Sequence, residues 1–158
     1  MDLRDVIPDQ LTGVRVAVGT VKPGYYNLDN RAGILGVDLV WDLEAIPWPL
    51  ADGCALEVCV GHVISRINPA RWGLLALFDE LWRILKPGGE LRVVTYYGLS
   101  SGFLGDPGAV KPVTECTFYY LDPEHRSGLW QRYQPAPWKL VHLEWAVEGN
   151  LEAILVKR

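Results

Sequence analysis

Apolar and polar positions form two kinds of pattern along this chain. Four short apolar runs come first, each bounded by Gly, Pro, Asn or Asp, and runs of this kind predict buried central strands. They cover Val14 to Val18, Tyr25 to Leu28, Val37 to Trp41, and Leu56 to Val60. Between Trp72 and Leu85, apolar side chains recur at helical spacing instead. This second pattern predicts an amphipathic helix that packs on a sheet.

The predicted helix is followed by a stop and a further strand. Lys86, Pro87, Gly88 and Gly89 come next; proline cannot continue a helix, glycine adopts positive φ, and a lysine suits the C-terminal dipole. Leu91 to Tyr97 then predicts another buried strand. Helix, stop and strand make half of a βαβ unit, and the run before the helix is its incoming strand.

The C-terminal third of the chain changes character twice. The segment from Gly98 to Pro137 is rich in Gly, Pro and Asp, and we interpret it as a loop-rich cap with one plausible strand, Thr117 to Leu121. After it, the apolar runs Leu140 to Val147 and Leu151 to Val156 flank a short loop, Glu148 to Asn150. This arrangement predicts an antiparallel hairpin that closes the sheet.

Length and composition indicate one folded domain. A chain of 158 residues has room for one compact core, so we expect a single domain over residues 1–158. The apolar fraction of 49% is that of a folded protein, and no apolar run approaches the roughly 20 residues of a membrane span. The first residues, MDLRDVIPDQ, lack the basic start and apolar stretch of a secretory signal, so a cytoplasmic location is expected.

Charge and cysteine content exclude some classes of partner. The net charge is −4 and no Lys/Arg cluster is present, which argues against nucleic acid as the partner. Cys54, Cys59 and Cys116 form no CxxC pair, so neither a disulfide framework nor a zinc site is predicted.

Three stretches of the sequence resemble one known family. "LFDELWRILKPGGELRVV" (Leu77 to Val94) closely resembles the helix, KPGG turn and fifth strand of class I S-adenosylmethionine (SAM) dependent methyltransferases. "VDLVWDLEAIPWPLADGCALEVCVGHVISRI" resembles the third strand of that family with its acidic end, the proline-rich connection, and the fourth strand with its His-containing loop. "GFLGDPGAVKPVTECTFYYLDP" resembles the segment after strand five in small phage-type and bacterial members.

The resemblance covers roughly residues 14 to 158 and implies a fold. The expected fold is α/β: a Rossmann-like methyltransferase sheet, mostly parallel, with a C-terminal antiparallel hairpin. It also implies SAM as the cofactor and no metal. A sulfonium is itself an activated methyl donor, so the protein mainly has to align the nucleophile and exclude water.

The first part of the implied cofactor site follows strands one and two. Gly19 and Thr20 match the start of the glycine loop that passes under the methionine moiety. Asp29 matches the acid that binds the ribose hydroxyls, with Asn27 nearby. A carboxylate is a good acceptor for a vicinal diol, and a buried ionised carboxylate needs such donors to offset its desolvation.

The second part of the implied site follows strands three and four. Asp42 and Leu43 match the pair beside the adenine, and Gly61 and His62 fall where strand four opens toward the methyl group. Open α/β sheets bind ligands at the carboxyl ends of their strands, where all these residues lie.

Two residues are candidates for catalysis, each with a simpler alternative. His62 either takes part in the reaction or only hydrogen-bonds the backbone beside the sheet. Asp106, in Gly-Asp-Pro-Gly, either acts as an acid or base or only forms a turn.

The sequence also departs from the family pattern. Val21 stands where relatives carry a second glycine, and a β-branched residue resists positive φ and fills space that the cofactor could use. The connections Thr20 to Gly24 and Asn30 to Gly36 are too short for crossover helices, so one sheet face has lost two helices. An uncovered apolar face is costly, at roughly 25 cal/mol per Å². We therefore expect a homodimer through this face, with the cap as the competing cover.

Two functions from different classes follow. The first is an enzyme that transfers the methyl group of SAM to an unidentified small or modest-sized acceptor. The second is a catalytically degenerate methyltransferase-like module for binding or assembly, which Val21 and the missing helices favour. A dinucleotide oxidoreductase is disfavoured because the chain lacks the Gly-x-Gly-x-x-Gly pattern.

Overall fold

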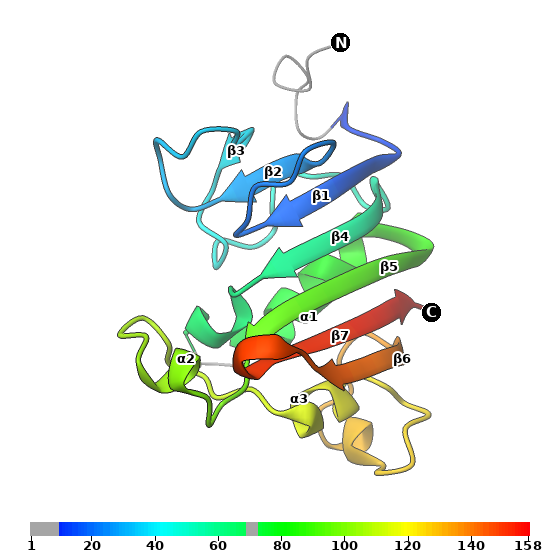
Figure 1. The fold of residues 1–158 in the computed structure, drawn as a ribbon. Helices are drawn as coiled ribbons and strands as arrows, with labels where there is room; N and C mark the ends of the chain where they lie inside the picture. Colours follow the sequence, from blue (N-terminus) through cyan, green and yellow to red (C-terminus); the bar gives the residue numbers. More distant parts are fainter. Residues whose placement is uncertain (1–9, 69–72) are drawn as a thin grey trace.

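The fold is built on one seven-stranded sheet. The computed structural model describes residues 10–68 and 73–158, and Figure 1 shows their arrangement. The strands are β1 (Val14–Val18), β2 (Tyr26–Asp29), β3 (Leu39–Val40), β4 (Ala55–Gly61), β5 (Leu85–Tyr96), β6 (Trp138–Trp145) and β7 (Asn150–Lys157). Their spatial order is β3-β2-β1-β4-β5-β7-β6. The first five run parallel, and β7 pairs antiparallel with both β5 and β6.

The strands predicted from apolar runs are confirmed, with different ends. The first run coincides with β1, whereas the third shrinks to the two residues of β3. The fifth begins earlier than expected, because β5 already includes the Lys-Pro-Gly-Gly segment after the helix. The predicted hairpin is confirmed as β6 and β7, and Glu148 and Gly149 between them have φ of 67° and 75°.

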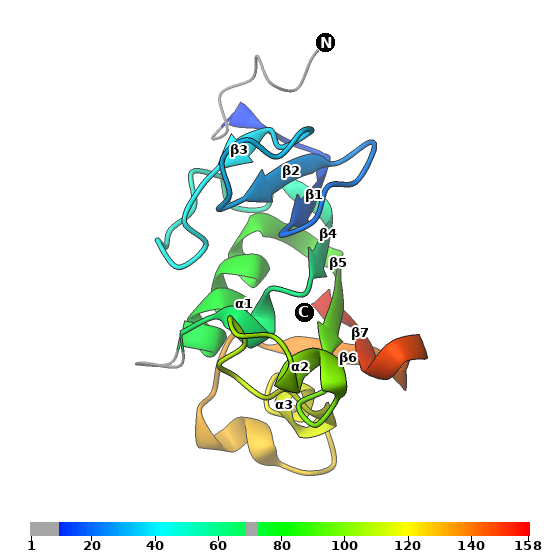
Figure 2. The same ribbon diagram turned by 60° about the vertical axis from the view of Figure 1, so that its left-hand side comes forward.

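Helices pack on one face of the sheet. The α-helices are α1 (Gly73–Ile84), α2 (Ser101–Leu104) and α3 (Glu115–Tyr119), and the 3₁₀ turns are η3 (Ile64–Arg66), η4 (Leu129–Arg132) and η5 (Val147–Gly149). Helix α1 confirms the predicted amphipathic helix, although the predicted first residue, Trp72, lies outside the described residues. Its buried Phe78 meets Phe118 of α3 edge-to-face, with ring centroids 6.3 Å apart. Figure 2 shows α1 alongside the strands on this face.

The predicted strand from Thr117 to Leu121 is wrong, because this segment forms helix α3. Thr, Phe and Tyr favour strands only weakly when no partner strand is available. Here the Thr117 hydroxyl accepts a hydrogen bond from the Thr114 N–H at 3.2 Å, as at a helix start. Phe118 is fully buried against α1 and holds the helix in place.

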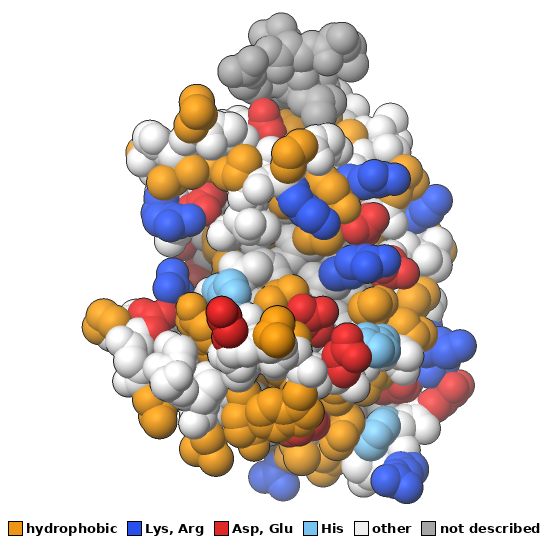
Figure 3. All heavy atoms as spheres, in the orientation of Figure 1, with side chains coloured by type: hydrophobic (Ala, Val, Ile, Leu, Met, Phe, Trp, Pro, Cys, Tyr) orange, Lys and Arg blue, Asp and Glu red, His pale blue; other side chains and the backbone are white. Residues whose placement is uncertain are grey.

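The opposite sheet face carries no helix in the part of the chain that the structure describes, as expected from the short connections (Figures 1 and 2). The expectation that this face is apolar holds only in part, because Cys59, Val94 and Ile154 share it with charged side chains. Glu57 lies between Arg15 and Arg92 on neighbouring strands, at 3.9 and 3.6 Å, and Tyr25 of the β1–β2 loop donates a hydrogen bond to Glu57 at 2.6 Å. Figure 3 shows Lys and Arg beside Asp and Glu on this face. The face therefore meets water partly through charged side chains, which lowers the cost that argued for a homodimer.

None of the described helices has the length and apolar character that crossing a membrane requires.

Candidate functional site

The carboxyl ends of the parallel strands surround a cavity of about 480 Å³. Loops after β1, β2, β3 and β4 reach the same edge of the sheet and supply most of its wall. Of the nine residues that the sequence singles out, seven line this cavity: Gly19, Thr20, Asp29, Asp42, Leu43, Gly61 and His62.

The loop after β1 touches the loop after β4 at one end of the cavity. Gly19 has a φ of 71°, and a Cβ at this position would overlap the Cγ2 of Val63 and lie 3.1 Å from the Gly61 carbonyl oxygen. Only glycine fits this conformation in this space. Thr20 in turn lies against the Cα of Gly61. The two glycines therefore let the loops approach each other closely.

Val21 does not occupy the cavity, contrary to the concern raised by the sequence. Its φ is not positive, and its Cγ1 lies toward Gly36 in the β2–β3 connection. The left-handed residues of this loop are Gly19 and Gly24. The substitution of the usual second glycine therefore leaves the cavity open.

Asp29 ends β2 and is bound by Arg31. Its Oδ1 accepts hydrogen bonds from the Arg31 backbone N–H at 2.9 Å and from Nε at 3.0 Å, and its Oδ2 accepts one from Nη2 at 2.8 Å. The hydrogen bonds from the Arg31 side chain lower the pKa of Asp29, against the opposing effect of burial. Asp29 is therefore ionised at neutral pH, and its side chain is only 2% exposed.

The β3–β4 connection forms the other end of the cavity. Asp42 starts a turn in which its Oδ1 accepts from the Glu44 N–H at 3.0 Å. The carbonyl of Leu43 accepts a 3.1 Å hydrogen bond from the indole of Trp48, which is buried. Trp48 is itself held by Glu80 of α1. The Glu80 carboxylate accepts a hydrogen bond from the backbone N–H of Trp48 at 2.7 Å. Helix α1 thus positions this end of the cavity.

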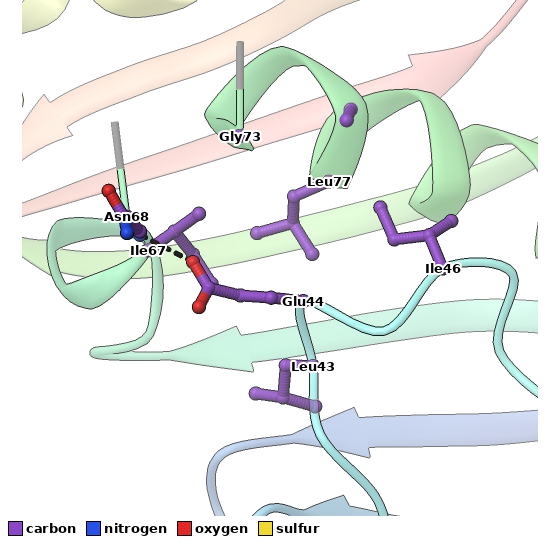
Figure 4. A pocket seen from close by; sticks show the side chains of 8 residues that line it. Leu43, Glu44, Ile46, Ile67, Asn68, Gly73 and Leu77 are labelled. Carbon is purple, nitrogen blue, oxygen red and sulfur yellow. Dashed lines mark hydrogen bonds between the residues drawn. The ribbon is translucent and has the colours of Figure 1, made fainter. Parts of the chain in front are cut away.

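A second pocket of about 320 Å³ adjoins this end. Figure 4 shows its wall of Leu43, Ile46, Ile67 and Leu77, with the Glu44 carboxylate beside them. Glu44 accepts a hydrogen bond from the backbone N–H of Asn68 at 2.5 Å. The two pockets share Leu43, Glu44 and Ile67. An apolar wall with a carboxylate at its rim suits a flat heteroaromatic group with an exocyclic amine.

His62 lies at the centre of the cavity wall in an unusual conformation. Its φ is 53°, which is rare for a residue other than glycine. Its ring lies 4.4 Å from that of Tyr96, and its buried Nδ1 has no hydrogen-bond partner among the described residues. Burial, and then the nearby Arg66, lower its pKa below the usual 6.5. The imidazole is therefore neutral at pH 7, with a free nitrogen.

Two predicted residues do not line the cavity. The Asn27 amide holds the β1–β2 loop, since its Oδ1 accepts from the Lys22 N–H at 2.8 Å and its Nδ2 donates to the Tyr25 carbonyl at 3.0 Å. Asp106 pairs with Arg66 at 2.8 Å and accepts from the Gly108 N–H, as a turn former does. Asp106 is thus connected to the cavity only through Arg66, which lines it.

The sequence interpretation missed seven residues of the wall, and those that carry a charge or an aromatic ring are Arg31, Glu44, Arg66 and Tyr96. Arg31 and Glu44 each follow a predicted acid by two residues, and this spacing is the available signal for them. Within the described residues, no group of three or more His, Cys, Asp and Glu side chains is placed to hold a metal ion.

Comparisons with known proteins identify the fold. No protein-family model matches the chain, and no curated protein matches it in sequence. Solved structures do match. A SAM-dependent methyltransferase from Archaeoglobus fulgidus has a TM-score of 0.65 and 16% identity, covering 98% of this chain and 91% of the other. One from Mesorhizobium loti has a TM-score of 0.63 and 14% identity, covering 98% and 95%.

A third similar structure contains the cofactor. The 16S rRNA (adenine(1408)-N(1))-methyltransferase from Catenulisporales acidiphilia with cosubstrate SAM has a TM-score of 0.57 and 17% identity, covering 99% of this chain and 90% of the other. The chain therefore has the fold of class I SAM-dependent methyltransferases. Identities this low establish the fold and leave the activity to be argued from the site.

Proposed function

We propose that this protein binds SAM in the strand-end cavity and transfers its methyl group to a small or modest-sized acceptor. The observation that carries this proposal is that seven residues from four separate loops, chosen from sequence as cofactor or catalytic residues, line one cavity. Parallel α/β sheets bind nucleotide-like ligands at this edge.

The residues present fit each part of this cofactor. The close approach at Gly19 leaves room for a ligand backbone beside Thr20. The buried carboxylate of Asp29 is an acceptor for ribose hydroxyls. The apolar pocket beside Leu43, with Asp42 near its mouth, is suited to the adenine.

The chemistry required of the protein is modest. When bound, SAM supplies an electrophilic methyl group that needs no covalent enzyme intermediate. The chain's own residues have to orient an acceptor next to Gly61 and His62 and keep water away. The neutral His62 lines the cavity and is available to fix the orientation of the acceptor or, after a turn of its ring, to accept a proton from it. We infer that Asp106 influences the reaction only indirectly, by holding Arg66 through their ion pair.

The second candidate, a degenerate binding module, is favoured by one specific observation. Arg31 already occupies the carboxylate that would receive the ribose. The argument from Val21 no longer supports it, because that side chain lies away from the cavity.

The kind of acceptor and the oligomeric state are two further proposals. The net charge of −4 favours a small acceptor over nucleic acid, although a neighbour in structure is named for methylation of 16S rRNA. A homodimer through the bare sheet face would join ionic surfaces, so we expect any such dimer to dissociate at high salt. Sedimentation at micromolar concentration in low and high salt tests this; a monomer in both would refute it.

Thermal unfolding with SAM and with S-adenosylhomocysteine, its demethylated product, tests cofactor binding. At a hundredfold excess over Kd, a ligand adds about 2.7 kcal/mol of stability, or several degrees at roughly 2–4 °C per kcal/mol. We expect this shift for the wild type and for Glu148→Gln, which alters an exposed carboxylate that does not line the cavity. Asp29→Asn should lose most of it. No shift for the wild type at millimolar ligand would reject the proposal.

A further inference from the structure

The ion pair of Asp29 and Arg31 lies within the wall of the strand-end cavity. Both residues line it, and they differ sharply in exposure. The Asp29 side chain is 2% exposed and that of Arg31 is 56% exposed. The carboxylate is therefore covered mainly by the arginine, and the arginine is open to solvent.

The hydrogen-bonding capacity of Asp29 is nearly used up in this arrangement. A carboxylate offers about four acceptor positions, two on each oxygen. Arg31 fills three of them: two on Oδ1, from its backbone N–H and Nε, and one on Oδ2, from Nη2. A vicinal diol that binds both oxygens needs one position on each, and Oδ1 has none left. Arg31 and a ribose diol therefore compete for Asp29.

The arginine can leave without breaking the loop. The hydrogen bonds recorded for its side chain within the described residues all go to Asp29. Its backbone N–H also donates to Asp29 and would stay in place, so the turn after β2 keeps its shape. The Arg31 side chain is already 56% exposed, so water takes over its hydrogen bonds when it leaves. The carboxylate would not be left unpaired either, because the diol hydroxyls replace the guanidinium.

We propose that Arg31 is a specificity-determining latch, whose guanidinium must leave Asp29 before a ligand with a vicinal diol can bind. This inference rests on the proposed function, because it concerns the same cavity. Removing the latch strengthens binding of ribose-containing ligands and leaves diol-free ligands unaffected.

Isothermal titration with S-adenosylhomocysteine tests the latch in the full-length protein. Two charge-assisted hydrogen bonds are lost on displacement, so we expect Arg31→Ala to bind about tenfold more tightly than the wild type. Arg31→Gln, which keeps some length and polarity, should fall between them. Arg66→Ala is the matched control: it removes a cation from the same cavity without touching Asp29. A general charge effect would strengthen binding equally in this control, and that result would overturn the latch.

A second pair of probes isolates the diol. Adenosine and 2′,3′-dideoxyadenosine differ only in the ribose hydroxyls. Arg31→Ala should improve the affinity for adenosine about tenfold and that for the dideoxy compound less than about twofold. Equal improvement for both, or unchanged or weaker binding of S-adenosylhomocysteine by Arg31→Ala, would overturn the latch and leave the proposed function standing.

The two proposals fail in different ways. If the wild type binds S-adenosylhomocysteine and Arg31→Ala binds it no more tightly, the latch is rejected and the proposed function stands. If neither the wild type nor any variant binds it at millimolar concentration, cofactor binding and the latch are both rejected. Unchanged circular dichroism and melting temperature of Arg31→Ala without ligand establish that the variant is folded.

Discussion

Substitution of Gly19 by alanine tests how the cavity is built. Gly19 has a φ of 71°, and left-handed backbone costs a residue with a Cβ about 1–2 kcal/mol. The new methyl group would also overlap Val63 Cγ2 and come within 3.1 Å of the Gly61 carbonyl oxygen. Overpacking of this kind costs about 1–3 kcal/mol more. We therefore expect Gly19→Ala to lower the free energy of unfolding by about 2–5 kcal/mol.

Urea unfolding followed by circular dichroism measures this loss. With an m value of about 2 kcal/mol/M, the midpoint should fall by about 1–2.5 M. Gly24→Ala is the matched control in the same loop: its φ is 78°, but nothing lies within 4 Å of the added Cβ. Gly24→Ala should therefore pay only the cost of the left-handed backbone, and its urea midpoint should fall by about 0.5–1 M.

Removing the opposing atom should relieve the clash. Val63→Ala deletes Cγ2 and lowers stability by itself, because Val63 is buried. In the Gly19→Ala background the same deletion should cost about 1–3 kcal/mol less, which is a coupling between touching residues. The reasoning fails if Gly19→Ala costs no more than Gly24→Ala, or if the two substitutions are additive.

Two further predictions concern the centre of the site and its support. Because burial keeps the pKa of His62 below 6.5 in the folded state, the unfolded state binds more protons below that pH. The stability of the wild type relative to His62→Asn should therefore fall as the pH is lowered from 7.5 to 5, and a pH-independent difference in urea midpoints would contradict this. Glu80→Gln should destabilise by about 3 kcal/mol, because it leaves the part-buried Arg83 and the Trp48 N–H with a neutral partner. Asp52→Asn, which removes the exposed partner of Arg83, should cost under about 1 kcal/mol in the same urea titration.

The sequence predicts the strands well because each is a continuous apolar run. Runs such as Val14 to Val18 stand out without any tertiary information, because most of their residues are apolar and the last three of this run are buried. Helix α3 could not be predicted in this way. Its residues favour a strand locally, and what decides its structure is Phe118 packing against Phe78, a contact between segments 40 positions apart in the chain.

The candidate site, too, could be predicted only in part from the sequence. Residues that directly follow strands, such as Asp29 and His62, could be placed from sequence because parallel strands end at one edge. Asn27 lies on the same side of β2 as Asp29, but two residues before the end of the strand, so its side chain contacts the β1–β2 loop and does not reach the cavity. The pairing of Arg31 with Asp29 depends on side-chain geometry and could not be read from the pattern.

The bare sheet face explains how the chain keeps this fold with two connections reduced to loops. A crossover helix normally covers the strands it joins, so its loss would expose apolar side chains. Here the exposed positions of neighbouring strands carry Arg15, Glu57 and Arg92 instead. Cross-strand ion pairs contribute only about 0.2–1 kcal/mol each, so their main effect is to reduce the apolar surface that this face exposes.

The short β1–β2 connection also shapes the cavity. In place of a helix, a short β1–β2 loop reaches β2 directly. Two hydrogen bonds hold this loop: Asn27 accepts one from the Lys22 N–H, and Tyr25 donates one to Glu57. This fixes Gly19 against Val63, where the wall of the cavity begins. The charged face and the strand-end cavity are therefore joined through one short loop. A substitution at Glu57 that frees Tyr25 should loosen the loop at Gly19, and would reach the cavity without touching any residue in its wall.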